Sequence, residues 1–99
     1  MSNILEISGK IVKVYPVRYT VTQIPITSFV VEHKSQQIEH NNTSEIYCRV
    51  FCVSIELDST ISNNLLHKNV TVFGFLNYNS KSQLVLHVKK IDFLDIEGN

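Results

Sequence analysis

The stretch ILEISGKIVKVY, residues 4–15, starts as a β-strand and changes its pattern halfway along. Apolar residues alternate on one face of its first half, and the phase of this alternation shifts beside Gly9. A phase change beside a glycine predicts a bulge or kink. A strongly bent first strand is what the closure of a small barrel requires. The alternating residues are Leu5, Ile7 and Ile11 before the shift, and Val12 and Val14 after it.

Four further segments share the period-two alternation that is typical of β-strands. They are residues 26–35, 45–55, 70–77 and 83–94. The segments 16–25, 36–44 and 77–82 are rich in polar residues, proline and asparagine, and they predict loops or turns.

A helical pattern interrupts the strands once. Leu57, Ile61 and Leu65 recur at helical spacing, which predicts one or two helical turns within residues 57–68. The predicted order is therefore three strands, a short helix or turn, and two strands, which is the order of an OB-fold. We expect an all-β, five-stranded OB-fold barrel that forms a single domain over residues 1–99.

Composition excludes several classes of protein. Nine Lys and Arg residues balance nine Asp and Glu residues, so no net charge draws the chain toward nucleic acid or membranes. No apolar run approaches the roughly 18 residues that span a bilayer. The segment MSNILEISG has no basic region followed by an apolar one, so it does not resemble a signal peptide. We expect a cytoplasmic protein.

The residues that support catalysis or cofactor binding are sparse. Three glycines, Gly9, Gly74 and Gly98, cannot form a phosphate-binding loop. Cys48 and Cys52 on one strand would lie about 13 Å apart, too far for a disulfide, and their spacing is not the usual one for zinc. The sequence therefore predicts no enzyme activity, no metal and no cofactor.

The segment 45–55 carries the pattern that points to a function. Tyr47, Arg49 and Phe51 alternate on one face as aromatic, basic and aromatic side chains. Single-stranded nucleic acids bind to such faces, because bases stack on aromatic rings and cations hold phosphates. The alternative is that Phe51 belongs to the core and the other two are ordinary surface residues. Further basic residues fall on elements that OB-folds use for binding, namely Lys13, Arg18, Lys34, Lys81 and Lys89.

Short motifs along most of the chain point to a known family. They are Leu5-x-x-Ser8-Gly9, Ile24-Pro25-x-x-x-Phe29-Val30-x-Glu32-His33-x-Ser35, Cys48, Val72-x-Gly74-Phe75 and Leu86-His87-x-x-x-Ile91-x-x-x-Asp95. Through them the sequence resembles the bacterial primosomal replication protein N (PriB) family, which is similar to the core of bacterial single-stranded DNA-binding protein. The motif around Phe29 is the most specific of the set.

The resemblance implies a homodimeric, nucleoid-associated OB-fold protein without cofactor or catalytic activity. It implies binding to single-stranded DNA, stabilisation of the primosomal helicase during replication restart, and recruitment of the primosome loading protein. Tyr47 occupies the position of the stacking tryptophan of the family. Lys13, Arg18 and Lys34 retain basic residues of its DNA-binding surface.

The sequence also departs from the family. Tyr47 is a smaller stacking platform than tryptophan, residues 36–44 lack aromatic and basic side chains, and Lys81 stands almost alone in a shortened 77–82 loop. These departures predict DNA binding that is weaker and less sensitive to salt than in a lysine-rich relative. They leave two alternatives open: an OB-fold adaptor with weak or lost DNA binding, and, more remotely, a thiol or metal enzyme built on the two cysteines.

Overall fold

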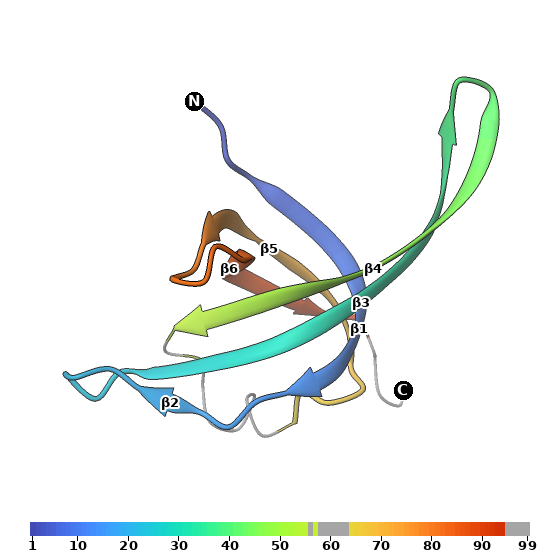
Figure 1. Cartoon of the computed structure of the whole chain (residues 1–99). Helices are drawn as coiled ribbons and strands as arrows, with labels where there is room; N and C mark the ends of the chain where they lie inside the picture. The colour runs from blue at the N-terminus through green and yellow to red at the C-terminus, as the bar shows by residue number, and fades with distance from the viewer. Residues whose placement is uncertain (56, 58–63, 95–99) are drawn as a thin grey trace.

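The computed structural model describes residues 1–55, 57 and 64–94, which form one curved β-sheet (Figure 1). No helix occurs among these residues, and hence none that could cross a membrane. The strands are β1 (Leu5–Val14), β2 (Arg18–Tyr19), β3 (Pro25–Glu39), β4 (Asn42–Ile55), β5 (Asn69–Tyr78) and β6 (Leu84–Phe93).

The sheet closes on itself. Its strand order is β1-β5-β6-β4-β3-β2, and an additional pairing of β1 with β3 joins the two ends. The pairing of β4 with β6 is parallel, whereas all other pairings are antiparallel. Strands β1, β3, β4, β5 and β6 thus form a closed, mixed, five-stranded barrel, which confirms the predicted OB-fold.

Strand β1 closes the barrel because it bends. Its first half pairs with β5 from Leu5 to Lys10, and its second half pairs with β3 from Lys10 to Val14. The register shifts between Ile11 and Lys13, so the predicted bulge is present. A Cβ atom on Gly9 would overlap the carbonyl oxygen of Glu32. Glycine is therefore needed where the two strands come together.

The barrel encloses the core that the alternation predicts. Phe29 and Val31, at alternate positions of β3, point inward. Both are fully buried, and a buried aromatic or branched side chain contributes about 1.5–3 kcal/mol. The fully buried core cluster consists of Ile11, Phe29, Val31, Cys52, Leu65, Val70, Val72 and Leu86.

Residues 36–44 do not form the expected loop. Strands β3 and β4 remain paired as far as Glu39 and Asn42, and the hairpin projects from the barrel (Figure 1). Its turn consists of His40 and Asn41, with φ values of 52° and 68°. Two residues with positive φ form the tight turn that fits the twist of paired strands. The loop prediction was wrong because backbone pairing continues where the side chains are polar.

The remaining connections differ less from expectation. Within the predicted loop 16–25, Arg18 and Tyr19 form the short strand β2 against the start of β3. The predicted helical turns lie mostly outside the described residues. The described end of that segment, residues 64–68, is a turn that buries Leu65 completely. The turn between β5 and β6 is present, with the Ser82 amide donating to the Asn79 carbonyl.

Candidate nucleic-acid interface

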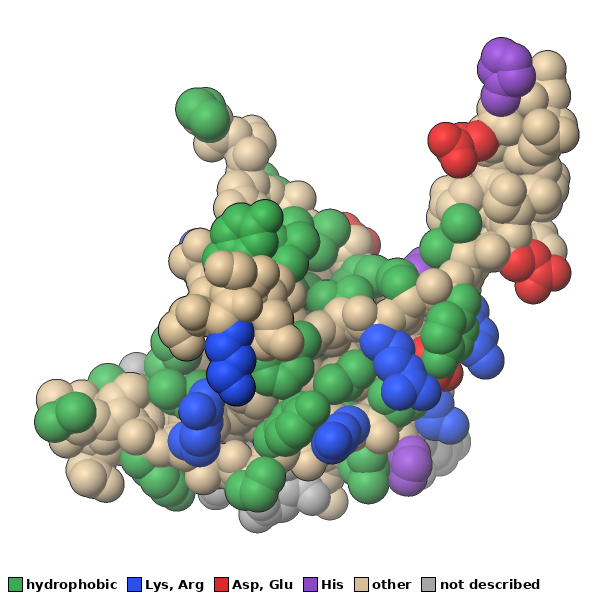
Figure 2. All heavy atoms as spheres, in the orientation of Figure 1, with side chains coloured by type: hydrophobic (Ala, Val, Ile, Leu, Met, Phe, Trp, Pro, Cys, Tyr) green, Lys and Arg blue, Asp and Glu red, His purple; other side chains and the backbone are tan. Residues whose placement is uncertain are grey.

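The outward side chains of the neighbouring strands β1, β3 and β4 form one continuous surface on the outside of the barrel. Strand pairing places Lys10, Glu32 and Arg49 in one row across the three strands. The next row contains Lys13 and Phe51. Figure 2 shows Lys and Arg side chains in a band across this side of the molecule, with hydrophobic side chains between them. We call this surface the aromatic–basic face; its members are Lys10, Lys13, Tyr15, Arg18, Lys34, Tyr47, Arg49, Phe51 and Lys81.

Tyr47 is held at its hydroxyl end and open to solvent over the rest. The residue is 56% exposed, and its hydroxyl donates a hydrogen bond to Oε2 of Glu32 at 2.6 Å. The Lys34 ammonium lies 5.8 Å from the centre of the ring. The side chain can therefore receive a stacked base without first having to be ordered.

Arg49 and Glu32 complete the environment of Tyr47. Arg49 Nε donates to the Tyr47 hydroxyl oxygen at 3.2 Å, and its terminal nitrogen donates to Glu32 at 3.3 Å. The hydrogen bond from Tyr47 is the main cause that lowers the pKa of Glu32 from its ordinary value. Desolvation, the second-largest effect, opposes this shift, and the neighbouring Lys34 and Arg49 charges lower the pKa further. Glu32 is therefore ionised at neutral pH.

A second aromatic pair lies further along the face. The rings of Tyr15 and Phe51 meet edge to face, with centroids 5.6 Å apart and planes at 74°. The Lys13 ammonium lies 4.8 Å from the Tyr15 centroid. Phe51 thus points outward against Tyr15 and does not belong to the core.

This aromatic pair joins two hollows. One hollow is lined by the pair together with Lys13 and Arg49. The other, an open groove of about 490 Å³, is lined by the pair together with Arg18 and Lys81. A path of cations and rings therefore runs from the β5–β6 loop, past Tyr15, to the hairpin of β3 and β4.

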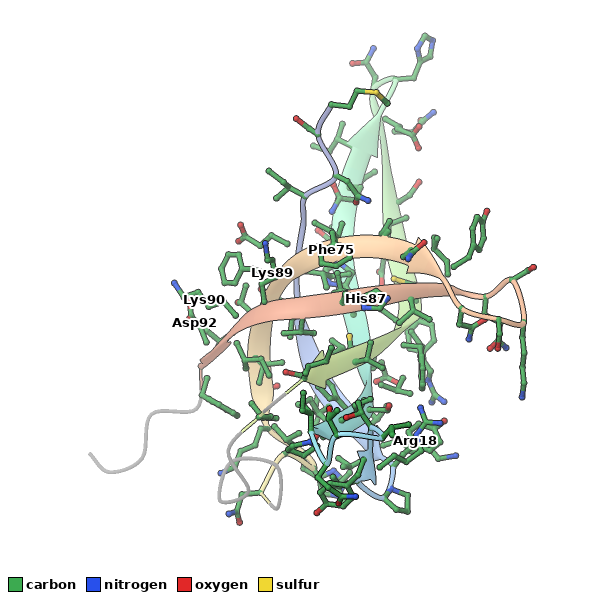
Figure 3. The ribbon with its side chains drawn as sticks, turned by 90° about the vertical axis from the view of Figure 1, so that its left-hand side faces the viewer. Arg18, Phe75, His87, Lys89, Lys90 and Asp92 are labelled. Atoms are coloured by element: carbon green, nitrogen blue, oxygen red, sulfur yellow. The ribbon has the colours of Figure 1, made fainter. Side chains whose placement is uncertain are left out.

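The structure brings six of the seven predicted site residues to this face and leaves one apart. Lys89 lies on β6, in a hollow with Ile55 and Lys90. Figure 3 shows Lys89, Lys90 and Asp92 together near the end of β6, away from Arg18. Lys89 lies apart because β6 runs on the other side of β4 from β3, which sequence proximity to the predicted binding loop does not reveal. The six residues on the face are Lys13, Arg18, Lys34, Tyr47, Arg49 and Lys81.

The sequence patterns did not single out Lys10, a member of the face, or Glu32, which lies among its members. Lys10 and Glu32 are paired across β1 and β3, and both lie near Lys34 in a shallow hollow. Glu32 stood in the sequence only as part of a family motif. The signal that could have found both residues is the strand register, because cross-strand neighbours interact directly.

His33 links two strands, and the two cysteines are free thiols. His33 Nδ1 donates to the Ser8 carbonyl oxygen at 2.6 Å, and its Nε2 lies 2.8 Å from the Ser35 hydroxyl oxygen. Cys48 and Cys52 are both free, and burial raises the pKa of the Cys52 thiol to about 12. Such a thiol stays protonated and is a poor nucleophile. In the part of the chain that is described, His, Cys, Asp and Glu form no group of three that could hold a metal ion.

Comparison with known proteins shows the family to which this chain belongs. One family model matches residues 3–90, and its description is "Another single-strand binding protein family". The chain belongs to this family of single-strand binding proteins. Its similar relatives include the replication restart protein PriB of Photorhabdus laumondii subsp. laumondii. That protein is 31% identical over 100 residues, which cover 95% of each chain.

Solved structures show the same fold. The structure of PriB from Ralstonia solanacearum matches with a TM-score of 0.84 at 17% identity, over 96% of this chain and 100% of that chain. The Plasmodium falciparum SSB in complex with single-stranded DNA matches with a TM-score of 0.70 at 14% identity, over 96% of both chains. At such identities these two likenesses bear on the fold alone.

Proposed function

We propose that this protein binds single-stranded DNA on the aromatic–basic face and acts as an accessory protein of replication restart, without a catalytic step. The observation that carries the proposal is the face itself, with Tyr47, Tyr15 and Phe51 set among cations. Membership of a single-strand binding family and relatives named as replication restart proteins support the same role.

The arrangement explains how a chain with no net charge can attract a polyanion. Six of its nine Lys and Arg residues lie on this one face. A local concentration of one charge creates an attractive potential even where the total charge is zero. The six are Lys10, Lys13, Arg18, Lys34, Arg49 and Lys81.

The proposed mode of binding divides the face between bases and phosphates. One base stacks on Tyr47, and others contact the pair formed by Tyr15 and Phe51. Stacking of this kind contributes about 1–3 kcal/mol per base. Phosphates meet the cations beside the rings, Arg18 and Lys81 at one end and Lys13 between the two aromatic sites.

Substitution of Tyr47 tests the proposal. We expect Tyr47→Ala to weaken binding of a fluorescently labelled oligo-dT about tenfold at low salt, since roughly 1.4 kcal/mol of stacking corresponds to that factor. Fluorescence anisotropy measures the affinity. Tyr78→Ala serves as the matched control, because Tyr78 is also well exposed, at 66%, but is not a member of the face. Equal affinities of the wild type and Tyr47→Ala would reject stacking at this residue.

The wider role includes partners that the family resemblance implies. We infer a homodimer in the bacterial cytoplasm, associated with the nucleoid, that stabilises the primosomal helicase on DNA and recruits the loading protein. Sedimentation velocity at micromolar concentration tests the dimer. A pulldown from the native cytosol tests the partners, and recovery of no replication protein would count against the bridging role.

A second function, as a protein adaptor with weak DNA binding, is favoured by one observation. Glu32 lies in the middle of the face and occupies donors of Tyr47 and Arg49. Helicase binding that persists after nuclease treatment, in a protein that does not bind oligo-dT, would favour the adaptor.

A further inference from the structure

Glu32 is a fixed negative charge within a surface of positive ones. It lies between Lys10 and Arg49 in the row that crosses β1, β3 and β4. On its own strand Lys34 approaches it, with Nζ 3.9 Å from Oε1. Two cations, Lys34 and Arg49, therefore pair with this single carboxylate, and Lys10 is its neighbour across the strand pair.

The carboxylate occupies the same donors that a phosphate would use. Oε2 accepts from the Tyr47 hydroxyl at 2.6 Å and from Arg49 at 3.3 Å. Carboxylate and phosphate oxygens accept the same charge-assisted hydrogen bonds. A phosphate that arrives here must share these donors with Glu32 or displace it, and it meets a like charge in either case.

The exposed fractions of the side chains show that Glu32 lies beneath Arg49 and Lys34. The Glu32 side chain is 18% exposed, whereas those of Arg49 and Lys34 are 60% and 71% exposed. The carboxylate thus lies against the sheet, and the cations remain open on their outer side. A ligand meets the cations first and the repulsion of Glu32 directly behind them.

We propose that Glu32 competes with DNA phosphate for the central cations of the aromatic–basic face and so determines which part of the strand lies there. This inference rests on the proposed function. An uncharged base on Tyr47 meets no repulsion from Glu32, whereas a phosphate at the same place does. The strand is therefore bound with a base at the centre and its phosphates toward Arg18, Lys13 and Lys81.

The variant Glu32→Gln tests this role. The amide keeps the size of the side chain and an acceptor oxygen for the Tyr47 hydroxyl, but it removes the charge. We expect the affinity for labelled oligo-dT at low salt to rise several-fold. We also expect the slope of log K against log salt to steepen by about 0.7, the value for one more phosphate contact on a single strand. Anisotropy titrations over a series of salt concentrations measure both quantities.

Glu6→Gln is the matched control. Glu6 is exposed on the same strand β1 as Lys10, but it pairs with Phe73 of β5 and lies outside the face. Both variants change the net charge by one unit. We expect Glu6→Gln to leave the affinity and the salt slope nearly unchanged.

Each other outcome is informative. Equal gains in both variants would show an effect of net charge alone, and weaker binding by Glu32→Gln would show that Glu32 merely holds Tyr47 in place; either result overturns the inference. In those cases the wild type still binds DNA and loses affinity in Tyr47→Ala. If neither the wild type nor Glu32→Gln binds, with both folded by circular dichroism, the proposed function itself fails.

Discussion

At the scale of the residue, the properties of Tyr47 depend on its neighbours. Alternation predicts that it points outward with Arg49, and the structure confirms this placement. It does not predict that Glu32 accepts hydrogen bonds from both side chains. The contacts arise because strand register places Glu32 opposite Arg49. Residue types alone therefore indicate a cationic surface around Tyr47, whereas the structure shows one that Glu32 partly neutralises.

The pH dependence of stability should report the ionised state of Glu32. Its pKa in the folded state lies below the ordinary value of 4.5, so its stabilising effect is fully present above about pH 4.5 and is lost as the pH falls through the folded value. We expect the difference in Tm between the wild type and Glu32→Gln to be constant from neutral pH to about 4.5 and to shrink below it. Thermal denaturation followed by circular dichroism measures the difference. A gap that widens with acid would contradict this assignment.

The two cysteines should differ in reactivity. Cys52 is fully buried and its pKa is about 12, so almost none of it is thiolate at mildly alkaline pH. We expect Ellman's reagent to modify Cys48 in the native protein and Cys52 only after unfolding in urea. The variant Cys48→Ser should then show no fast-reacting thiol. Two equally fast thiols in the native wild type would mean that Cys52 is accessible.

At the scale of the element, β1 and the β3–β4 hairpin shape the face. The bend of β1 brings Lys10 and Lys13 alongside β3. The His33 side chain on β3 forms a hydrogen bond with the Ser8 carbonyl of β1. This bond lies beyond Lys10 and Glu32, where the backbone pairing of β1 with β3 ends. The phase shift beside Gly9 predicts the bend, whereas the length of the hairpin was missed because its pairing relies on backbone hydrogen bonds between polar residues.

Substitution of Gly9 tests the closure of the barrel. Gly→Ala in an open strand stabilises by about 0.4–1 kcal/mol, but here the new Cβ would overlap the Glu32 backbone. We expect Gly9→Ala to lower the free energy of unfolding by about 1–3 kcal/mol. Urea denaturation followed by circular dichroism measures the change. Glu6→Ala, at an exposed position of the same strand, should stay within about 0.5 kcal/mol of the wild type, and a stable Gly9→Ala would show that the strands can separate freely.

At the scale of the whole molecule, the strand order of the barrel places one group of basic residues on the aromatic–basic face and another, Lys89 and Lys90, on β6. Lys81, on the β5–β6 loop, reaches the groove that contains Arg18 and Phe51. Lys89 and Lys90 lie elsewhere, and Lys90 forms an ion pair with Asp92 at 3.8 Å. We therefore expect only the first group to contact the DNA that is bound on the aromatic–basic face.

A pair of lysine variants tests this division. We expect Lys81→Gln to weaken oligo-dT binding and to reduce the salt slope by about 0.7, the loss of one phosphate contact. Lys89→Gln makes the same chemical change outside the face and should leave both quantities nearly unaltered. The measurements are salt-dependent anisotropy titrations. A larger effect for Lys89→Gln would place the DNA on β6.

The sequence by itself determined the five barrel strands, the bend of β1 and the outward direction of Tyr47 and Arg49. These properties follow from local periodicity, because successive side chains of a strand alternate between core and solvent. The tertiary structure alone decided that Glu32 lies among the cations, that Lys10 joins the face and that Lys89 does not. Those facts depend on register and on strand order in the closed barrel, which bring together residues from distant parts of the chain.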